Sequence, residues 1–335
     1  MKNVKFSTLE LATVVKGSNL AGAMARAVES AQASEKYGFE RIWLAEHHNM
    51  EYIASSATSL LIQHIAAQTD NIRVGSGGIM LPNHAPLVIA EQFGTLETLF
   101  PGRVEIGLGR APGTDQQTAM ALRRNNLNTS FYFKDDVLAL QQFLSNNNHT
   151  AKVRAFPGEG LEIPLWILGS STDSAYLAAE LGLPYAFAAH FAPAMLSNAI
   201  DIYRANFKAS EQLQEPYVLI CANIIPGETN EEAQRLSTSL FNMFCEIITN
   251  RRAPLSPPTD EPIYAGIAEI EQAVQSMVSC TFVGDKSTLT TELKTFVDRY
   301  QPDEVMATNY IFDNTKRLDA FRIISEIFND INLSK

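Results

Sequence analysis

The sequence predicts an α/β protein with the architecture of a (β/α)8 TIM barrel, and three observations lead to that prediction. Short apolar runs rich in β-branched residues recur eight times along the 335-residue chain. Nearly every run is followed by a stretch with helical spacing of apolar residues, which favours parallel strands, right-handed crossovers and a closed barrel over an open sheet. Two neighbouring runs, within Ile72–Gly113, end in glycines, which suits a flat ligand lying close to the main chain.

The first half of the chain supplies four strand–helix units. The expected strands are Val4–Leu9, Arg41–Ala45, Ile72–Met80 and Val104–Gly109. The expected helices run from Met24 toward Gly38, from about Ala54 to Gln68, from Pro86 to Phe100 and from Lys134 to Leu144. Pro86 suits the first turn of a helix, and Pro101-Gly102 ends that helix.

The second half continues the same alternation with two interruptions. The expected strands are Leu165–Gly169, Tyr185–Ala189, Tyr217–Ile225 and Glu304–Thr308. The expected helices open at Ser171–Ser174 and cover Pro193–Phe207, Glu231–Thr249, Lys286–Tyr300 and Leu318–Ile331. Insertions are expected after strands 4 and 7, as a surface excursion at about 146–160 and a mobile, proline-rich insertion at about 250–280. No linker rich in proline or glycine separates two halves, so residues 1–335 are expected to form a single domain.

Charge and cysteine content exclude several classes of protein. Twenty-six Lys and Arg against 37 Asp and Glu give a net charge of −11, which disfavours nucleic-acid binding. Cys221, Cys245 and Cys280 form no CxxC pair and indicate a reducing compartment. The N-terminus lacks the apolar segment of a signal peptide, and no apolar run approaches the roughly 18 residues that span a bilayer. We therefore expect a cytoplasmic protein that does not enter a membrane.

Polar side chains come at the C-terminal ends of the expected strands, and in a barrel these ends converge on one mouth. The residues are Ser7, Glu46, His47, His48, Ser76, Asn83, His84, Arg110, Ser170, Ser171, His190 and Asn223. Because they include four of the six histidines, the mouth is the expected site of the chemistry.

The histidines and the carboxylate at the mouth allow several roles. His47 and His48 are neighbours on an extended segment, so only one side chain can face the mouth and the other is expected to be a hydrogen-bonded structural histidine. His47 is a candidate for the catalytic histidine, and a structural role fits it equally well at this point. His84 precedes a helix and suits a capping or loop role. Glu46 suits either a general base or an anchor for a neighbouring loop or histidine.

The segment Gly107–Pro112 resembles the opening of a dinucleotide-binding fingerprint. A proline stands where the third glycine belongs, however, and no acidic residue follows at the distance that ribose recognition requires. Binding of a dinucleotide in the Rossmann manner is therefore not expected. The glycines still permit a flat ring to approach the backbone, and Arg110 offers a fixed cation for an anion.

The segment Gly169–Ser174 lies where a strand gives way to a helix. Its hydroxyls and free backbone N–H groups suit a phosphate at the positive end of the helix. The simpler alternative is helix capping by Thr172 or Asp173. Three serines exceed what capping needs, which favours the phosphate.

Histidines and carboxylates at a barrel mouth also occur in metal-dependent hydrolases. The sequence has no His-x-His after the first strand, no HExxH and no evident cluster of three ligands. We therefore expect no metal site.

Several motifs in this order resemble those of the bacterial luciferase-like flavin-dependent oxidoreductases. They are Trp43–His48 (WLAEHH), Gly75–His84 (GSGGIMLPNH), Gly107–Gly113 (GLGRAPG), Leu168–Ser171 (LGSS) and Phe187–Pro193 (FAAHFAP). The last two resemble a luciferase-like monooxygenase subgroup in particular. The resemblance extends over nearly the whole chain.

The resemblance implies an activity as well as a fold. Members are (β/α)8 barrels, usually dimeric, that bind reduced FMN at the barrel mouth, where a flavin C4a-peroxide formed with O2 oxygenates a small organic substrate. We accordingly expect a homodimeric monooxygenase that receives its reduced flavin from a separate flavin reductase and acts on an apolar substrate. His47 would position or protonate the peroxide as a general acid, and the insertion at about 250–280 could act as a lid that excludes water.

The resemblance also assigns residues to the site. His47 corresponds to the catalytic histidine, and Gly77-Gly78 to a dipeptide with an unusual cis peptide bond beneath the flavin ring. Arg110 and Ser170 correspond to phosphate contacts. The full set of expected cofactor-binding residues is Ser76, Gly77, Gly78, Gly109, Arg110, Gly169, Ser170, Ser171 and Ser174. Ser7 and His190 are expected to line the substrate pocket.

Two alternatives to this activity remain. Relatives in the wider superfamily use the deazaflavin F420 and transfer hydride, although the motifs match the FMN-dependent members more closely. A protein that stores or shields FMN without catalysis would also retain the glycines and serines. Gly109 stands where the light-emitting subunit of luciferase has a cysteine, so bioluminescence is not expected.

Overall fold

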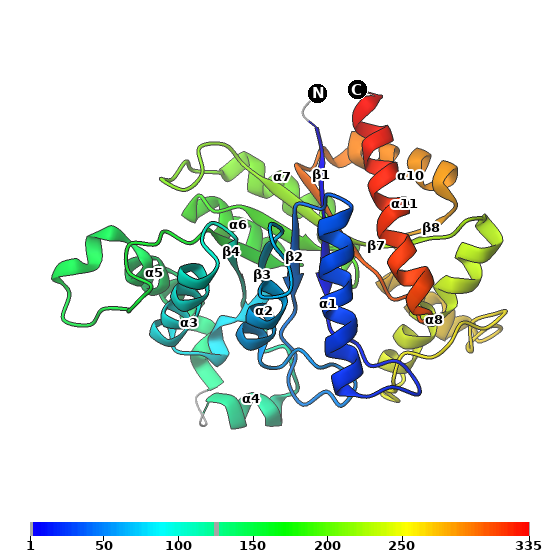
Figure 1. Cartoon of the computed structure of the whole chain (residues 1–335), viewed down its shortest axis with the longest axis horizontal. Coiled ribbons are helices and arrows are strands. Elements are labelled where there is room, and N and C mark those ends of the chain that lie inside the picture. Colours follow the sequence, from blue (N-terminus) through cyan, green and yellow to red (C-terminus); the bar gives the residue numbers. More distant parts are fainter. Residues whose placement is uncertain (1–2, 124–126, 335) are drawn as a thin grey trace.

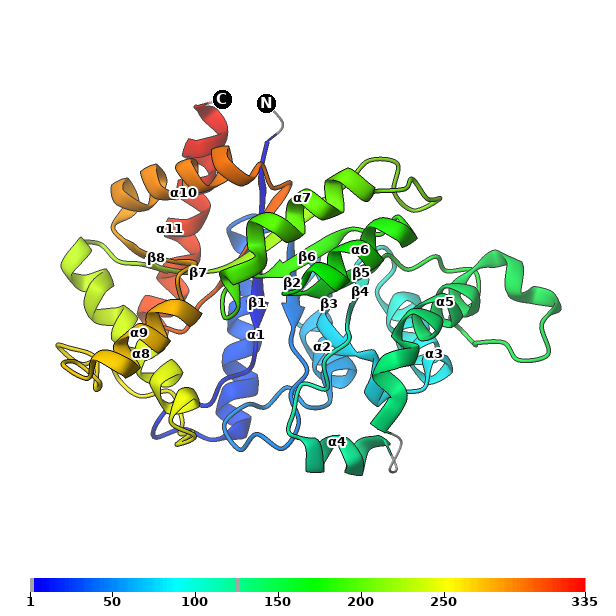
Figure 2. The ribbon, with the colours of Figure 1, turned by 180° about the vertical axis from the view of Figure 1, so that it is seen from behind.

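The computed structural model describes residues 3–123 and 127–334 and contains the expected barrel (Figure 1, Figure 2). Within these residues, eight parallel strands close into a ring in which β6 pairs with β7, β7 with β9, and β9 with β1. They are β1 (Lys5–Glu10), β2 (Arg41–Leu44), β3 (Arg73–Met80), β4 (Val104–Gly109), β5 (Leu165–Gly169), β6 (Tyr185–Ala188), β7 (Val218–Pro226) and β9 (Glu304–Thr308). The prediction of a (β/α)8 TIM barrel is confirmed.

Helices surround the ring in the expected order. They are α1 (Leu20–Lys36), α2 (Thr58–Ala66), α3 (Pro86–Leu99), α5 (Phe133–Leu144), α6 (Thr172–Leu181), α7 (Leu196–Asn206), α8 (Asn230–Ile248), α10 (Lys286–Tyr300) and α11 (Asn314–Leu333). Side-chain caps fix where several helices begin. At the start of α1, for example, the Asn19 side chain accepts a hydrogen bond from the Gly22 N–H at 2.9 Å. In Figure 1, α1 and α11 lie side by side, so the first and last helices close the outer layer together. In the described ranges, no helix is both long and apolar enough to cross a bilayer.

Apolar side chains fill two separate layers. Between strands and helices, the ring of Phe6 stacks on that of Phe328 with centroids 5.3 Å apart. Inside the barrel, Trp43 meets Trp166 edge to face at 5.0 Å. This division follows from the alternation of side chains along each strand, since successive residues point to opposite faces.

The N-terminal end of the barrel interior holds buried charge. The Arg41 guanidinium forms ion pairs with the carboxylates of Glu105 and Glu304, the latter at 2.9 Å. All three residues are at most 3% exposed, and such charges are tolerated in an interior only when they are paired. This end is therefore filled by a structural cluster, which leaves the C-terminal end for a ligand.

The two insertions contain more regular structure than expected. Between β4 and α5 come α4 (Gln116–Arg123) and the 3-10 helix η2 (Leu127–Tyr132), before the expected excursion, and the 3-10 helix η3 (Asn146–Thr150) lies at its start. After α8 come α9 (Ala268–Met277) and a further strand, β8 (Thr281–Gly284), which pairs with the end of β7 outside the ring. Insertions after strands 4 and 7 are thus confirmed, whereas α4, α9 and β8 were not expected from the sequence. The mobility of residues 250–280 stays a prediction.

The segment between α8 and α9 reaches the C-terminal mouth. Leu255 accepts a hydrogen bond from the Lys16 N–H and donates one to the Val14 carbonyl, both at 2.9 Å, in the loop that follows β1. In Figure 1 the chain enters β1 from the top, and this segment lies on the lower side with α4. The insertion therefore borders the mouth, and its role as a lid stays a prediction.

Candidate functional site

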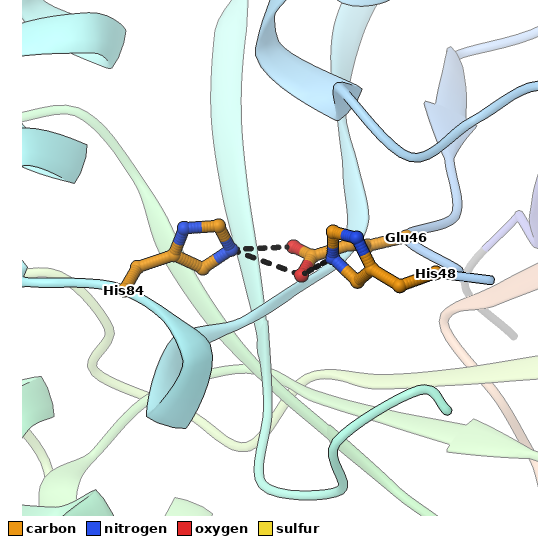
Figure 3. Close-up of side chains that lie close together, drawn as sticks. All are labelled: Glu46, His48 and His84. Atoms are coloured by element: carbon orange, nitrogen blue, oxygen red, sulfur yellow. Dashed lines mark hydrogen bonds and ion pairs between the residues drawn. The ribbon is translucent and has the colours of Figure 1, made fainter. Parts of the chain in front are cut away.

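The loops after β2 and β3 bring a carboxylate and two imidazoles together at the mouth (Figure 3). His48 Nε2 lies 2.8 Å from Glu46 Oε1, and His84 Nε2 lies 2.9 and 3.0 Å from the two oxygens of the same carboxylate. The 3-10 helix η1 (Leu81–Asn83) turns the chain after β3 so that His84 faces Glu46. His84 therefore bonds to Glu46 and does not cap α3.

Glu46 is the centre of this cluster. Its carboxylate is fully buried and also accepts from the Met80 N–H at 3.0 Å and from Asn83 Nδ2 at 3.2 Å. Burial disfavours the charged form, but the hydrogen bonds from His48 and His84 outweigh it and hold the pKa of Glu46 at about 2. Of the two expected roles, the structure shows the anchor for neighbouring loops and histidines.

His47 lies in a different environment from His48. Its Nδ1 is buried and has no hydrogen-bond partner within residues 3–123 and 127–334. Burial lowers the pKa of His47 to about 4. The negative charge of Glu46 opposes this shift, and the positive charge of Arg252 adds a smaller lowering. His48 is thus hydrogen-bonded, as expected for one of the two adjacent histidines, and the role of His47 in the chemistry stays a prediction.

His190, in the loop after β6, resembles His47 in both respects. It is 8% exposed, and its Nδ1 also has no hydrogen-bond partner in the described part of the chain. Burial, together with the nearby imidazole of His47, lowers the pKa of His190 to about 3. Burial thus favours the neutral form of both imidazoles, and His47 adds to the lowering of the pKa of His190.

The backbone of His190 is fixed by a buried network that sequence analysis missed. Asn223 Nδ2 donates to the His190 carbonyl at 2.7 Å and to Thr281 Oγ1 at 3.0 Å, while Thr308 Oγ1 donates to Asn223 Oδ1 at 2.5 Å. Asn223 was expected at the mouth because it lies near a strand end. Its partners come from β8 and β9, far along the chain, so no local pattern indicated them.

The Gly77-Gly78 peptide bond is cis, as the resemblance implied. A Cβ atom on Gly77 would lie 2.7 Å from Leu9 Cδ1, and one on Gly78 would lie 2.7 Å from Leu168 Cδ1. Real Cβ atoms do not approach this closely, so neither position has room for a side chain. The two glycines therefore allow the end of β3 to pack closely against the barrel interior.

Ser76 and Gly109 differ from their expected surroundings. The Ser76 hydroxyl is buried and donates to the Gly107 carbonyl at 2.9 Å, so it bonds within the sheet and not at the mouth. A Cβ atom on Gly109 would lie 2.7 Å from Met80 Sδ, so a methionine side chain occupies the space beside this glycine. A flat ring could approach Gly109 only if the flexible end of the Met80 side chain moved aside.

The N-terminus of α6 gathers most of the expected phosphate-binding residues. Ser171 caps the helix through the Ser174 N–H at 3.5 Å, so the alternative considered from the sequence, capping by Thr172 or Asp173, is not what the structure shows. The Ser174 hydroxyl donates to the Ser171 carbonyl at 2.7 Å, close to Gly169, where a Cβ atom would collide with it. Capping thus uses Ser171 and Ser174.

Arg110 and Ser170 lie next to this helix end. Arg110 Nη2 is 3.3 Å from an oxygen of Asp173, in the first turn of α6, and both side chains are about half exposed or more. Ser170 is partly buried immediately before the cap. An exposed cation beside a helix N-terminus is an arrangement that binds phosphate.

Ser7 is not at the end of its strand, because β1 continues to Glu10. Its side chain lies on the same face of β1 as Leu9, which packs inside the barrel with Trp43. The Ser7 hydroxyl is fully buried and has no hydrogen-bond partner in the ranges that the structure describes. Ser7 is therefore deeper than the mouth residues.

Comparison with known proteins agrees with the motifs. The family model for luciferase-like monooxygenases matches residues 4–299. YvbT of Bacillus subtilis (strain 168) is 46% identical over 330 residues, which cover 98% of either chain, and a luciferase-like monooxygenase of Escherichia coli (strain K12) is 44% identical with the same coverage. The crystal structure of apo-MsnO8 has 31% sequence identity and a TM-score of 0.89 over 98% of this chain and 99% of MsnO8. The chain therefore belongs to the luciferase-like monooxygenase family and is an oxidoreductase.

Proposed function

We propose that this chain is a flavin-dependent monooxygenase that uses reduced FMN and O2 to oxygenate a small, apolar organic substrate. The observation that carries the proposal is the pair of imidazoles of His47 and His190, each with a buried Nδ1 that has no hydrogen-bond partner in the described chain. Buried polar atoms are nearly always hydrogen-bonded in folded proteins. Two such atoms near the mouth of a barrel indicate a ligand that completes their bonding.

The residues around the mouth fit FMN. Arg110, Ser170 and the N-terminus of α6 offer a cation, a hydroxyl and backbone N–H groups to a phosphate. Gly77-Gly78, the dipeptide that the resemblance places beneath the flavin ring, forms a cis peptide bond near the end of β3. Bound reduced flavin would supply the electrons that activate O2.

The chain itself would supply proton handling and shielding from water. With a pKa of about 4, His47 is neutral near pH 7. The sequence suggested a general acid on the basis of the ordinary pKa of histidine. We propose instead that the neutral imidazole accepts a proton or donates one hydrogen bond at Nδ1. Beneath the mouth, Leu9, Trp43 and Trp166 fill the barrel and exclude water from that side.

The proposal includes partners as well as a cofactor. A separate flavin reductase would deliver reduced FMN, and the active protein would be a homodimer. The alternatives are F420-dependent hydride transfer and storage of FMN without catalysis. The unpartnered imidazoles favour catalysis, because a storage protein has no use for a neutral proton acceptor in the pocket.

A cofactor titration followed by oxygen uptake tests the proposal. Purified protein is titrated anaerobically with reduced FMN, oxidised FMN and reduced F420, and O2 consumption is then followed with a panel of aldehydes and other apolar compounds. We expect tightest binding of reduced FMN and O2 uptake coupled to product formation. Preferential binding of F420 would support hydride transfer, and FMN binding without any product would support storage.

A further inference from the structure

The cluster of Glu46, His48 and His84 is distinct from the unpartnered pair that the proposed function uses. Figure 3 shows the carboxylate of Glu46 between the two imidazoles, with each Nε2 directed toward it. One ligand atom from each of the three residues lies within 4.8 Å of the other two. Two imidazole nitrogens and a carboxylate oxygen are a common ligand set for zinc and other first-row transition metals in proteins.

We propose that Glu46, His48 and His84 bind a divalent first-row transition ion such as Zn²⁺ through the carboxylate and the two Nε2 atoms. The proposal goes beyond the proposed function and does not depend on it. Each imidazole would bind the ion in its neutral form, with the ring proton on Nδ1.

The surroundings of the cluster suit an ion that keeps water among its ligands. Glu46 and His84 line a groove with a volume of about 390 Å³ between α2 and α3. The His84 side chain is 27% exposed and that of His48 15%, whereas the Glu46 side chain is 1% exposed. An ion can therefore enter from the groove and retain open coordination positions, while the carboxylate stays shielded from bulk water.

The ligands are held by backbone and amide contacts. The Met80 N–H and Asn83 Nδ2 donate to the carboxylate of Glu46, and Asn83 Nδ2 also donates to the Pro112 carbonyl at 2.9 Å. The Thr114 hydroxyl donates to the His48 carbonyl at 2.9 Å. Supporting contacts of this kind orient metal ligands in known sites. They tie the ends of β2, β3 and β4 together around the cluster.

The competing explanation is a hydrogen-bonded clamp without metal, in which each imidazole donates its Nε2–H to Glu46. The two explanations need different atoms, because a metal needs the Nε2 lone pair and the clamp needs the Nε2 proton. A glutamine at position 84 can donate an amide N–H to Glu46 but is a poor ligand for zinc or cobalt. His84→Gln and His48→Gln therefore separate the explanations, and His64→Gln, at an exposed position on α2, is the matched control.

The test uses the full chain without an affinity tag, stripped of metal with a chelator. Zn²⁺ binding is measured by calorimetry, Co²⁺ binding by visible absorption, and the melting temperature is recorded with and without Zn²⁺. We expect one ion per chain and a higher melting temperature for the wild type and His64→Gln. Both cluster variants should lose more affinity than the roughly 10- to 100-fold that removal of a supporting residue costs.

Two results would overturn the proposal. One is a wild type that binds neither ion, and the other is unchanged metal affinity in both cluster variants; either would leave the clamp as the explanation. Should a cluster variant fail to fold, X-ray absorption of the Zn²⁺-loaded wild type decides, because the proposal requires two imidazole ligands at about 2.0–2.1 Å. None of these readouts involves flavin, so they are independent of the proposed function.

Discussion

The adjacent histidines of the luciferase-like motif, His47 and His48, differ in their hydrogen bonding. His48 is bonded to a buried carboxylate, whereas Nδ1 of His47 has no hydrogen-bond partner in the described ranges. Burial keeps His47 neutral, which frees its nitrogens for a ligand. We therefore propose that His47 takes part in the chemistry, whereas His48 holds Glu46 at the mouth.

Replacing His47 with alanine should cut coupled oxygenation by about 100-fold or more, the usual effect of losing a general acid or base. Binding of reduced FMN should stay within a few-fold, because His47 is not among the proposed phosphate contacts. Stopped-flow kinetics and flavin fluorescence measure the two quantities. His64→Ala, on the exposed surface of α2, should match the wild type in both. Unchanged turnover in His47→Ala would remove this residue from the mechanism.

The burial of His190 makes stability depend on pH. Its folded-state pKa of about 3 lies below the ordinary value of 6.5, so the unfolded chain binds a proton that the folded chain does not as pH falls below 6.5. Stability contributed by this group is therefore present at pH 7 and is lost as pH falls toward 3. Between pH 7 and pH 5 the loss should be about 2 kcal/mol.

Urea unfolding of the wild type and of His190→Asn at pH 7 and pH 5 measures this effect. The variant should lose about 2 kcal/mol less than the wild type over that interval. The lowered pKa of His47 also makes stability fall with pH, but this residue is present in both proteins. The difference between the two losses of stability therefore reports on His190. Equal losses would show that His190 is not held neutral by burial.

At the scale of elements, the first turn of α6 and the end of β4 lie side by side and form the proposed phosphate site. Arg110 and the backbone N–H groups of α6 meet where Asp173 already pairs with the guanidinium. A phosphate would compete with that carboxylate for Arg110. The pair is exposed and therefore weak, so the exchange costs little.

Arg110→Ala should weaken FMN binding by about tenfold, the effect of one charge-assisted hydrogen bond at a solvated site. Riboflavin, which lacks the phosphate, should bind both proteins equally. Fluorescence titration with both flavins makes the comparison. Arg154→Ala, at a surface arginine paired with Glu159, is the control and should leave both affinities unchanged. A loss of riboflavin affinity equal to that for FMN would contradict the phosphate assignment.

The glycines at the ends of β3 and β4 should differ in their tolerance of a methyl group. A Cβ atom on Gly78 would lie 2.8 Å from the Gly107 carbonyl, which is backbone, whereas one on Gly109 would meet only the movable side-chain end of Met80 at this distance. Gly78→Ala should therefore cost about 1–3 kcal/mol of unfolding free energy and Gly109→Ala less. Urea unfolding of both variants gives the order, and the reverse order would contradict the packing argument.

The barrel strands were predictable because each is an apolar run followed by a helical pattern. The sequence analysis missed β8, which has four residues that are mostly half-buried, and α9, which follows a proline-rich stretch. The hydrogen bonds between Glu46 and the histidines of the site were not predicted either. Glu46 and His84 are 38 residues apart, and their contact depends on the turn η1 after β3, which no periodic pattern indicates.

At the scale of the whole molecule, the closed ring gathers side chains from distant strands at one end. His47 follows β2 and His190 follows β6, yet the ring places them close enough for the charge of one to lower the pKa of the other. Buried ion pairs fill the opposite end around Arg41. The insertion that contains Leu255 borders the mouth by pairing with the loop after β1.

Single-turnover oxygenation with ¹⁸O2 tests the central proposal most directly. The enzyme is loaded with reduced FMN, mixed with ¹⁸O2 and the panel of apolar substrates, and the products are analysed by mass spectrometry. We predict one ¹⁸O atom in the product of the wild type and at least about 100-fold less labelled product from His47→Ala. Oxidation of the flavin with no label in any organic product, or substrate reduction with F420 in place of FMN, would contradict it.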